Sequence, residues 1–255
     1  MNWLNRAGTS VLLAGQTFLH LLRGHIHRRN TLDQLSAVGL ESLFIVLLTA
    51  VVISGVFTIQ VAREFINFGA SSLIGGVLAI ALTRELTPVV TGVIMAGRVG
   101  SAFAAELGTM KVTEQIDALQ VLRTDPIDYL VIPRVVACSF MLPILTMLSL
   151  IAGLIGGMII CSTVYNISPN LFLDSAQTLL EPWDLIVCLL KAIVFGSLIA
   201  IVGSNWGLTT TGGAKGVGRS TTDAVVTALL SIFISNFFLS WILFQGPGQA
   251  LSQAF

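Results

Sequence analysis

Long apolar segments separated by short polar ones form the main pattern of this sequence. Four of them, at about residues 42–62, 133–163, 185–206 and 224–244, carry at most one charged side chain each. A helix needs about 20 predominantly apolar residues to cross a bilayer, and each segment reaches that length. Barrel strands would instead alternate polar and apolar residues over roughly ten positions. The pattern therefore predicts membrane-spanning helices.

A fifth apolar zone, residues 65–105, contains three charged residues: Arg84, Glu85 and Arg98. It is too long for one ordinary span and short for two spans with a turn between them. The first interpretation is a lead-in at about 67–72 followed by one long, tilted helix at about 73–104. The alternative is two short helices broken between Arg84 and Pro88, which would reverse the orientation of every later span.

The first 30 residues show a different pattern. Apolar side chains recur there at every third or fourth position, as in an amphipathic helix: Trp3, Ala7, Val11, Ala14, Phe18, Leu22 and Ile26. A basic tail, Arg23 to Arg29, follows. We expect residues 1–30 to lie in the membrane interface and residues 31–255 to form the membrane domain. The alternative is a helix packed on the protein's own surface.

Three polar connections separate the spans. Between the second and third spans, Val112, Ile116 and Leu119 repeat at helical spacing, which predicts a short amphipathic helix at about 108–122, ended before Asp125-Pro126. Residues 166–184 are expected to form a polar loop without Lys or Arg. Residues 207–222 are expected to form a Gly/Thr loop, capped by Ser220 or Thr221 before the last span.

Composition and charge fix the class and the orientation. Hydrophobic residues make up 55% of the 255-residue chain and charged residues 10%, against about 25% charged residues in soluble domains. The fold class is therefore all-α integral membrane, and the formal net charge of zero gives no basic field for nucleic acid. With five spans, one side receives most basic loop residues: Arg6, Arg23, Arg28, Arg29, Lys111, Arg123, Arg134, Lys215 and Arg219. This bias predicts a cytoplasmic N-terminus and an external C-terminus.

The adjacent Arg84 and Glu85 are the first candidate functional residues. An ionised side chain near the bilayer centre costs about 2.5–3.5 kcal/mol on insertion scales, so such residues seldom face lipid. Neighbours on a helix point about 100° apart, and at least one of the two needs another partner. Lys191 of the fourth span is the candidate for Glu85. The pair either lines or gates a substrate cavity, or holds helices in register.

Other candidate sites favour packing rather than chemistry. The small residues Gly97, Gly100 and Ser101 suit a close helix contact or a dimer contact, and Ser101 lacks the surroundings of a catalytic serine. Three cysteines, Cys138, Cys161 and Cys188, lie in apolar segments without metal-ligand spacing. The stretch GAKGVGRS at 213–220 nearly matches a phosphate-binding loop, but Arg219 stands where lysine is required and no strand precedes it. We expect no catalytic residue, no metal and no ATP site in this chain.

The stretch RELTPVVTGVIMAGRVGSAFAAELGTMKVTEQIDAL from Arg84, followed by Asp125-Pro126 and YLVIPR from Tyr129, resembles the MlaE (YrbE-like) permease family. The similarity covers about residues 65–244. It implies a homodimer of five-span subunits with an interfacial N-terminal helix, and a lipid-binding cavity between protomers that opens toward an MCE-domain partner. Cavity residues implied by the resemblance are Arg84, Glu85, Pro88 and Lys191. Asn236 departs from relatives with an acid in the last span, which puts an extension of the charged network to that span in doubt.

The resemblance also implies a coupling helix at about 108–122, which docks on a cytoplasmic ABC ATPase that binds ATP and Mg. Its expected contact residues are Lys111, Glu114, Gln115, Asp117 and Leu119. The expected function is the permease subunit of an ATP-driven transporter moving phospholipid or a similar lipid between the inner membrane and an MCE protein. The expected location is the bacterial inner membrane or, alternatively, a plastid inner envelope. Rival functions are a proton-coupled secondary transporter using Glu85 and a structural anchor for an envelope complex.

Overall fold

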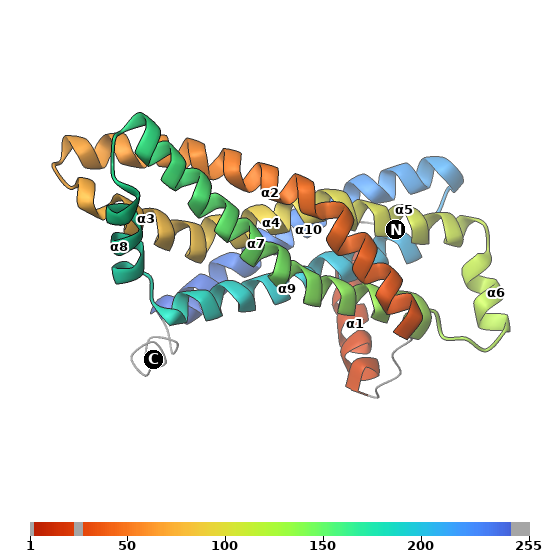
Figure 1. Cartoon of the computed structure of the whole chain (residues 1–255). Helices are drawn as coiled ribbons and strands as arrows, with labels where there is room; N and C mark the ends of the chain where they lie inside the picture. Colours follow the sequence, from red (N-terminus) through yellow and green to blue (C-terminus); the bar gives the residue numbers. More distant parts are fainter. Residues whose placement is uncertain (1–2, 23–27, 246–255) are drawn as a thin grey trace. The chain divides into compact units, whose positions relative to one another are not determined.

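The computed structural model describes residues 3–22 and 28–245 (Figure 1). Both ranges are helical, with no strand in either. Five helical segments in them are long and apolar enough to cross a membrane: Arg29–Asn67, Ser71–Val112, Ile127–Val164, Pro182–Leu208 and Gly213–Phe244. The all-α integral membrane class is confirmed. Most of the basic tail after the first helix lies outside the described residues.

The α-helices follow one another along the chain with few intervening residues. Their bounds are α1 Trp3–Leu22, α2 Arg28–Asn67, α3 Ile74–Ala81, α4 Thr87–Met95, α5 Ser101–Val112, α6 Gln115–Val121, α7 Ile132–Val164, α8 Pro169–Leu179, α9 Pro182–Leu208 and α10 Gly213–Ser240. A 3₁₀ turn, Ser71–Leu73, precedes α3. Wider π-helical turns join or extend the others: Leu82–Leu86, Ala96–Gly100, Ile127–Val131 and Trp241–Gln245.

These helices form two compact units, each built from three stretches of the chain. The first comprises the described residues of Met1–Ser42 together with Gly92–Leu142 and Ile193–Ser235. The second comprises Leu43–Thr91, Pro143–Ala192 and the described residues of Asn236–Phe255.

The second span is one continuous helical segment from Ser71 to Val112, so the first interpretation of the 65–105 zone is correct. The alternative, a break between Arg84 and Pro88, is wrong: the chain there forms a π-helical turn, in which the Thr87 N–H reaches the Leu82 carbonyl. Proline has no N–H to offer the carbonyl four residues earlier, and a wide turn is one way to keep a helix continuous there.

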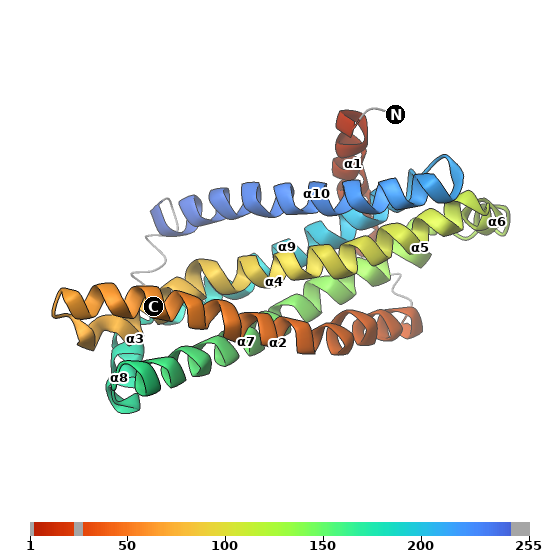
Figure 2. The same cartoon turned by 90° about the horizontal axis from the view of Figure 1, so that it is seen from above.

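In the second unit, α3 packs closely against α8 (Figure 2). A methyl group on Gly75 would collide with the Phe172 carbonyl, so only glycine permits this approach. The Gly76 N–H donates to Ser175 Oγ at 3.0 Å. Phe172 is buried in a cluster of apolar side chains that includes Ile74, Leu78 and Cys161. The contact therefore fixes α8 to the beginning of the second span.

Helix α8 corrects the expectation of a polar loop at 166–184. Ser168 caps it by accepting a hydrogen bond from the Leu171 N–H at 3.2 Å, and Pro169 occupies its first turn. Phe172, Ser175 and Ala176 are buried on one face at helical spacing. The polar residues that suggested a loop at 166–184 lie on the exposed face of this short amphipathic helix.

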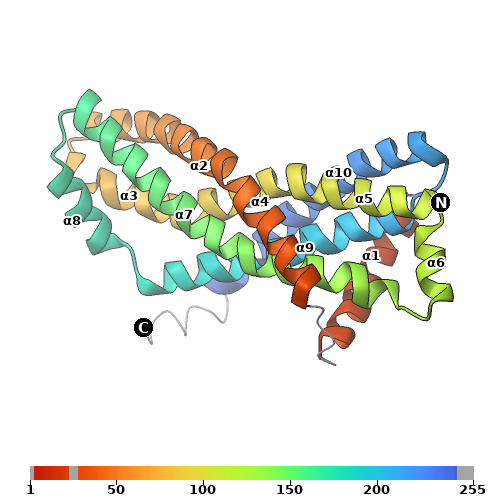
Figure 3. The same ribbon diagram turned by 45° about the vertical axis from the view of Figure 1, so that its right-hand side comes forward.

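In the first unit, the helix expected at 108–122 is wrong as a single element. Helix α5 continues to Val112, Glu114 adopts a left-handed backbone with φ of 61°, and α6 begins at Gln115 (Figure 3). Ile116 is buried with Leu107 and Leu130. The chain turns at Thr113 and Glu114 because α6 must bring Ile116 onto this small apolar cluster.

The Gly/Thr loop expected at 207–222 is also wrong. Helix α9 continues to Leu208 and α10 begins at Gly213, so four residues connect them. Gly212 and Gly213 have φ of +92° and +64°, a region that other residues rarely adopt. Ser220 and Thr221 lie inside α10, and neither caps its start.

Helix α1 packs one face on the protein and exposes the other. Ser10, Leu13 and Thr17 are buried, and α1 contacts the π-helical turn Ile127–Val131. Its other face exposes apolar side chains: Val11, Leu12, Phe18 and Leu19. One face therefore packs on the protein, and the other suits the lipid interface.

Candidate functional site

Glu85 is the centre of a polar cluster in the second unit. Its Oε1 accepts hydrogen bonds from Lys191 Nζ at 2.9 Å and from Ser240 Oγ at 2.7 Å. Its Oε2 accepts one from Asn236 Nδ2 at 2.7 Å. The donors come from α9 and α10, so the carboxylate joins three of the apolar helical segments. The Glu85 side chain is 45% exposed, whereas that of Lys191 is fully buried.

Lys191 has a second role that follows from Pro88. Proline at position 88 leaves the carbonyl of residue 84 without the amide donor that an α-helix would supply. Lys191 Nζ donates to the Arg84 carbonyl at 2.6 Å and also to Ser240 Oγ at 2.8 Å. The ammonium group therefore replaces the missing backbone donor while it pairs with the carboxylate. A buried lysine with all three N–H groups used satisfies its hydrogen-bonding capacity.

Arg84 has a partner of its own, Asp184 near the start of α9. Its Nε and Nη2 donate to the two carboxylate oxygens at 2.7 and 3.3 Å, the forked geometry that arginine forms with carboxylates. Asp184 is fully buried, and its Oδ2 also accepts from the Glu181 N–H at 3.3 Å. The guanidinium lies 4.7 Å from the centre of the Phe244 ring, in a cation–π contact.

A cavity of about 360 Å³ adjoins this cluster. It is lined by charged, hydroxyl and aromatic side chains: Arg84, Glu85, Phe237, Ser240, Trp241 and Phe244. The two cations and two carboxylates of the cluster cancel, so the polar part of the cavity carries no net formal charge. Aromatic walls around such a polar part suit an amphipathic molecule. The arrangement supports binding rather than bond making or breaking.

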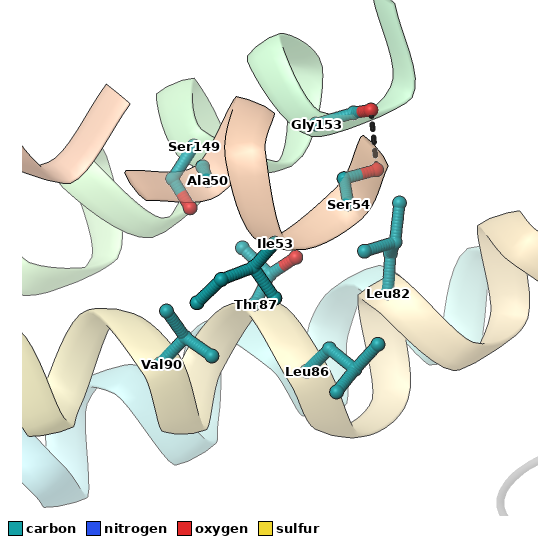
Figure 4. Close-up of a pocket in the computed structure, with 9 residues that line it drawn as sticks. All are labelled: Ala50, Ile53, Ser54, Leu82, Leu86, Thr87, Val90, Ser149 and Gly153. Atoms are coloured by element: carbon teal, nitrogen blue, oxygen red, sulfur yellow. Dashed lines mark hydrogen bonds between the residues drawn. The ribbon is translucent and has the colours of Figure 1, made fainter. Parts of the chain in front are cut away.

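The same π-helical turn presents its leucines to a different set of neighbours (Figure 4). Leu82 and Leu86 face a hollow of about 10 Å³ whose remaining lining comes from α2, α4 and α7: Ala50, Ile53, Ser54, Thr87, Val90, Ser149 and Gly153. Ser54 Oγ donates to the Gly153 carbonyl at 2.6 Å across it. This volume holds one water molecule at most, so the hollow is a feature of packing and no ligand site.

The other cavity candidate, Pro88, is buried in α4 and does not line the cavity; its missing N–H leaves the Arg84 carbonyl to the Lys191 ammonium group. The expected coupling residues lie in the first unit. Lys111 Nζ pairs with Asp117 Oδ1 at 2.8 Å, and Glu114 and Gln115 are exposed around the turn into α6. Leu119 is half-buried against the apolar cluster of Leu107, Ile116 and Leu130. These residues form an exposed, mixed-charge corner held by apolar contacts.

The small residues Gly97, Gly100 and Ser101 do not form one contact. A methyl group on Gly203 of α9 would lie 2.8 Å from the Gly100 carbonyl, so these backbones approach closely. Gly97 has open space around it. The Ser101 hydroxyl donates to the Gly97 carbonyl within its own helix.

Sequence reasoning missed three members of the polar cluster. Asp184 was assigned to a loop, although an acid at the start of an apolar span is a helix N-terminus signal. Ser240 gave no signal in an apolar segment. Asn236 raised doubt about a network reaching the last span, but its amide supplies that link by donating to Glu85.

One group of potential metal ligands occurs in the described part of the chain. Ligand atoms of His20, Asp125 and Asp128 lie within 4.8 Å of one another. His20 Nδ1 and Asp128 Oδ1 are 2.7 Å apart, a hydrogen bond that ties α1 to the start of the third span. The hydrogen bond explains why His20 lies beside the two aspartates without a metal ion.

The fold and the polar cluster define a multi-pass helical membrane protein with a buried charged network. Comparison with known proteins is more specific: residues 31–242 match the family described as Permease MlaE, and the chain belongs to this family. The resemblance noted from the Arg84 stretch is thereby confirmed.

Three relatives illustrate the range of this similarity. The chain is 64% identical to a probable ABC transporter permease protein, slr1045, of Synechocystis, over 97% of this chain and 94% of the relative. It is 52% identical to Protein TRIGALACTOSYLDIACYLGLYCEROL 1, chloroplastic, of Arabidopsis thaliana, over 96% and 70%. It is 43% identical to a probable ABC transporter permease protein, RT0041, of Rickettsia typhi, over 83% and 82%.

Proposed function

We propose that the chain is the membrane subunit of an ATP-driven transporter that moves phospholipid, or another two-tailed lipid, between the membrane and an MCE-domain partner. Family membership and relatives named as ABC transporter permeases support the transporter class. A chloroplast relative that carries a lipid's name supports a lipid substrate. The bacterial inner membrane is the proposed location, with a plastid inner envelope as the alternative.

The observation that carries the proposal is the polar cluster around Glu85 beside the aromatic cavity. Four ionised side chains in apolar helices are costly and are kept where they serve a substrate path or a switch. The lipid headgroup would lie against Glu85 and Arg84, with the aromatic rings of Trp241 and Phe244 against its glycerol and upper acyl region. Because the cluster is neutral overall, it would bind a headgroup weakly enough for the lipid to be released.

ATP would be bound and hydrolysed, with Mg, in a separate cytoplasmic subunit. The exposed corner at Lys111, Glu114 and Asp117 would dock into a groove on that subunit, as short helical segments do on soluble partners. A second copy of the chain would complete the lipid cavity. In the described part of α10, apolar side chains remain exposed, in keeping with a lipid or protomer contact: Val226, Leu230, Phe233, Ile234, Phe237 and Phe238.

The test reconstitutes the chain with its ATPase and MCE partner in proteoliposomes and measures fluorescent phospholipid transfer. Lys191→Met should lower ATP-dependent transfer at least tenfold, because it removes both the partner of Glu85 and the donor to the Arg84 carbonyl. Lys215→Met, at an exposed lysine in the first turn of α10, is the matched control and should retain transfer. Transfer driven by a pH gradient without ATP would contradict the proposal and favour a proton-coupled transporter.

A further inference from the structure

A second cavity, of about 200 Å³, lies in the first unit and shares no lining residue with the Glu85 cluster. It is lined by Arg6 of α1, by the end of α9 and by the first turns of α10: Trp206, Thr211, Gly216, Arg219, Ser220 and Asp223. Most of these side chains are polar, and two are guanidinium groups. The lining includes part of the GAKGVGRS stretch, to which the transport function assigns no role.

Arg6 is held rigidly at the edge of this cavity. Its Nε donates to Thr209 Oγ1 at 2.9 Å, and its Nη2 donates to the Trp206 carbonyl at 3.0 Å and to Ser220 Oγ at 3.2 Å. The guanidinium also lies 4.2 Å from the centre of the Trp206 ring. Within the described residues, no hydrogen bond uses Nη1. Burial lowers the pKa of Arg6 from its usual value, but arginine remains charged at neutral pH.

The other groups around the cavity leave an excess of positive charge and unused donors. Arg219 is 86% exposed and lies 3.9 Å from Asp223, too far for a hydrogen bond, so its guanidinium remains available. The Asp223 carboxylate offsets only one of the two arginines. The side chains that line the cavity therefore carry one net positive charge.

The start of α10 adds to this preference. The helix has 28 residues and no acidic side chain in its first turn, so its dipole favours an anion near this end. A methyl group on Gly216 would collide with the Thr211 carbonyl, so glycine allows the connection to fold tightly against this turn. Two arginines and a hydroxyl around one cavity match the chemistry by which proteins hold phosphate.

We propose that this cavity binds a phosphate group, supplied by the headgroup of an anionic phospholipid. The exposed apolar face of α1, with Val11 and Phe18, suits the membrane interface. Since Arg6 belongs to the same helix, the cavity would lie at headgroup depth. A bound phosphate would bridge Arg6 of α1 and Arg219 of α10 and so fasten the interfacial helix to the last span. Free phosphate offers the same chemistry and is the other source to be distinguished.

The test uses the full chain purified in an uncharged detergent. Binding of dihexanoyl phosphatidylglycerol is measured by microscale thermophoresis, beside inorganic phosphate and uncharged dihexanoylglycerol. Arg219→Gln should weaken phosphatidylglycerol binding at least fivefold, whereas Lys215→Gln, which removes the same charge from the same helix end outside the cavity lining, should change it less than twofold. Asp223→Asn should strengthen binding, because it removes the competing carboxylate.

Each outcome decides the proposal. Lipid binding at least tenfold tighter than phosphate binding, with the expected variant pattern, supports the headgroup. Equal affinities with that pattern support a phosphate site but overturn the lipid source. Equal weakening by Arg219→Gln and Lys215→Gln indicates diffuse surface charge and overturns the site, as does dihexanoylglycerol binding as tightly as phosphatidylglycerol. These measurements need no ATPase and no transport, so they stand apart from the transport function.

Discussion

Lys191 donates a hydrogen bond to the Arg84 carbonyl at 2.6 Å, and this is the carbonyl that Pro88 leaves without a helical donor. The same ammonium group pairs with the Glu85 carboxylate at 2.9 Å. A backbone irregularity and an ion pair therefore depend on one side chain. Loss of Lys191 would leave the carbonyl without a donor and the carboxylate without its counter-ion at the same time.

Lys191→Met should destabilise the protein by about 3 kcal/mol, at the lower end for breaking a buried ion pair because the Glu85 side chain is 45% exposed. The double variant Lys191→Met with Glu85→Gln should recover part of this loss, since no unpaired charge remains. The measurement is thermal unfolding in detergent, followed by the loss of monodisperse protein. A double variant as unstable as the two single losses added together would show that the pair is not coupled.

Pro88→Ala tests whether the hydrogen bond from Lys191 to the Arg84 carbonyl replaces the donor that proline lacks. Alanine restores an N–H that can donate to the Arg84 carbonyl, so the cost of Lys191→Met should fall by about 1 kcal/mol in the Pro88→Ala background. A double-mutant cycle on melting temperatures gives this coupling. Additive effects of the two substitutions would show that Lys191 does not serve the carbonyl.

Asn236→Leu should lower stability by about 1.5–3 kcal/mol, the range for a hydrogen bond to a charged group. It removes the 2.7 Å donor to Glu85 Oε2. Phe238→Leu, two residues away on the same helix and exposed, is the control and should unfold with the wild-type profile. Equal melting temperatures for Asn236→Leu and wild type would argue that the Asn236 amide does not stabilise the carboxylate.

Gly75→Ala should destabilise the protein by about 1–3 kcal/mol, the usual cost of forcing an extra carbon into a tight contact. The added methyl group would meet the Phe172 carbonyl of α8. Gly97→Ala makes the same chemical change in open space and should be neutral or slightly stabilising. Comparable losses for both glycines would locate the effect in helix propensity rather than in the α3–α8 contact.

Glu114→Lys combined with Asp117→Lys should abolish co-purification with the ATPase subunit and leave the oligomeric state of the chain unchanged. Both side chains are exposed, so the change reverses the charge of the corner before α6 without disturbing a core. Chemical crosslinking or light scattering checks the oligomer. Undiminished co-purification of the double variant would remove this corner from the docking surface.

The sequence predicted the class, the number of spans and the most costly charges, because long apolar segments and intramembrane ions are signals that tertiary contacts do not override. It did not predict α8, since Phe172 and its neighbours become visible as a buried face only once Gly75 and Gly76 are known to lie against them. The break at Glu114 was missed for a similar reason. Helical spacing continues through the turn, and only the burial of Ile116 with Leu107 and Leu130 requires it.

In the candidate site, too, some residues could be predicted from the sequence and others depend on tertiary contacts. Glu85 and Lys191 stand out as charges in apolar segments, and the cost of an ionised group in a membrane makes Lys191 the candidate partner of Glu85. The hydrogen bonds from Asn236 and Ser240 depend on which face of α10 meets the π-helical turn. No periodicity in an almost uniformly apolar segment indicates that face.

The spacing of the Glu85 partners along the chain has a consequence for biosynthesis. Lys191, Asn236 and Ser240 follow Glu85 by 106, 151 and 155 residues. At about 5–20 residues per second, the ribosome needs roughly 8–30 s to supply the last donor after the carboxylate has emerged. Until then the nascent second span must wait beside the translocon or an insertase with its charges shielded, so membrane insertion of this protein should depend strongly on that machinery.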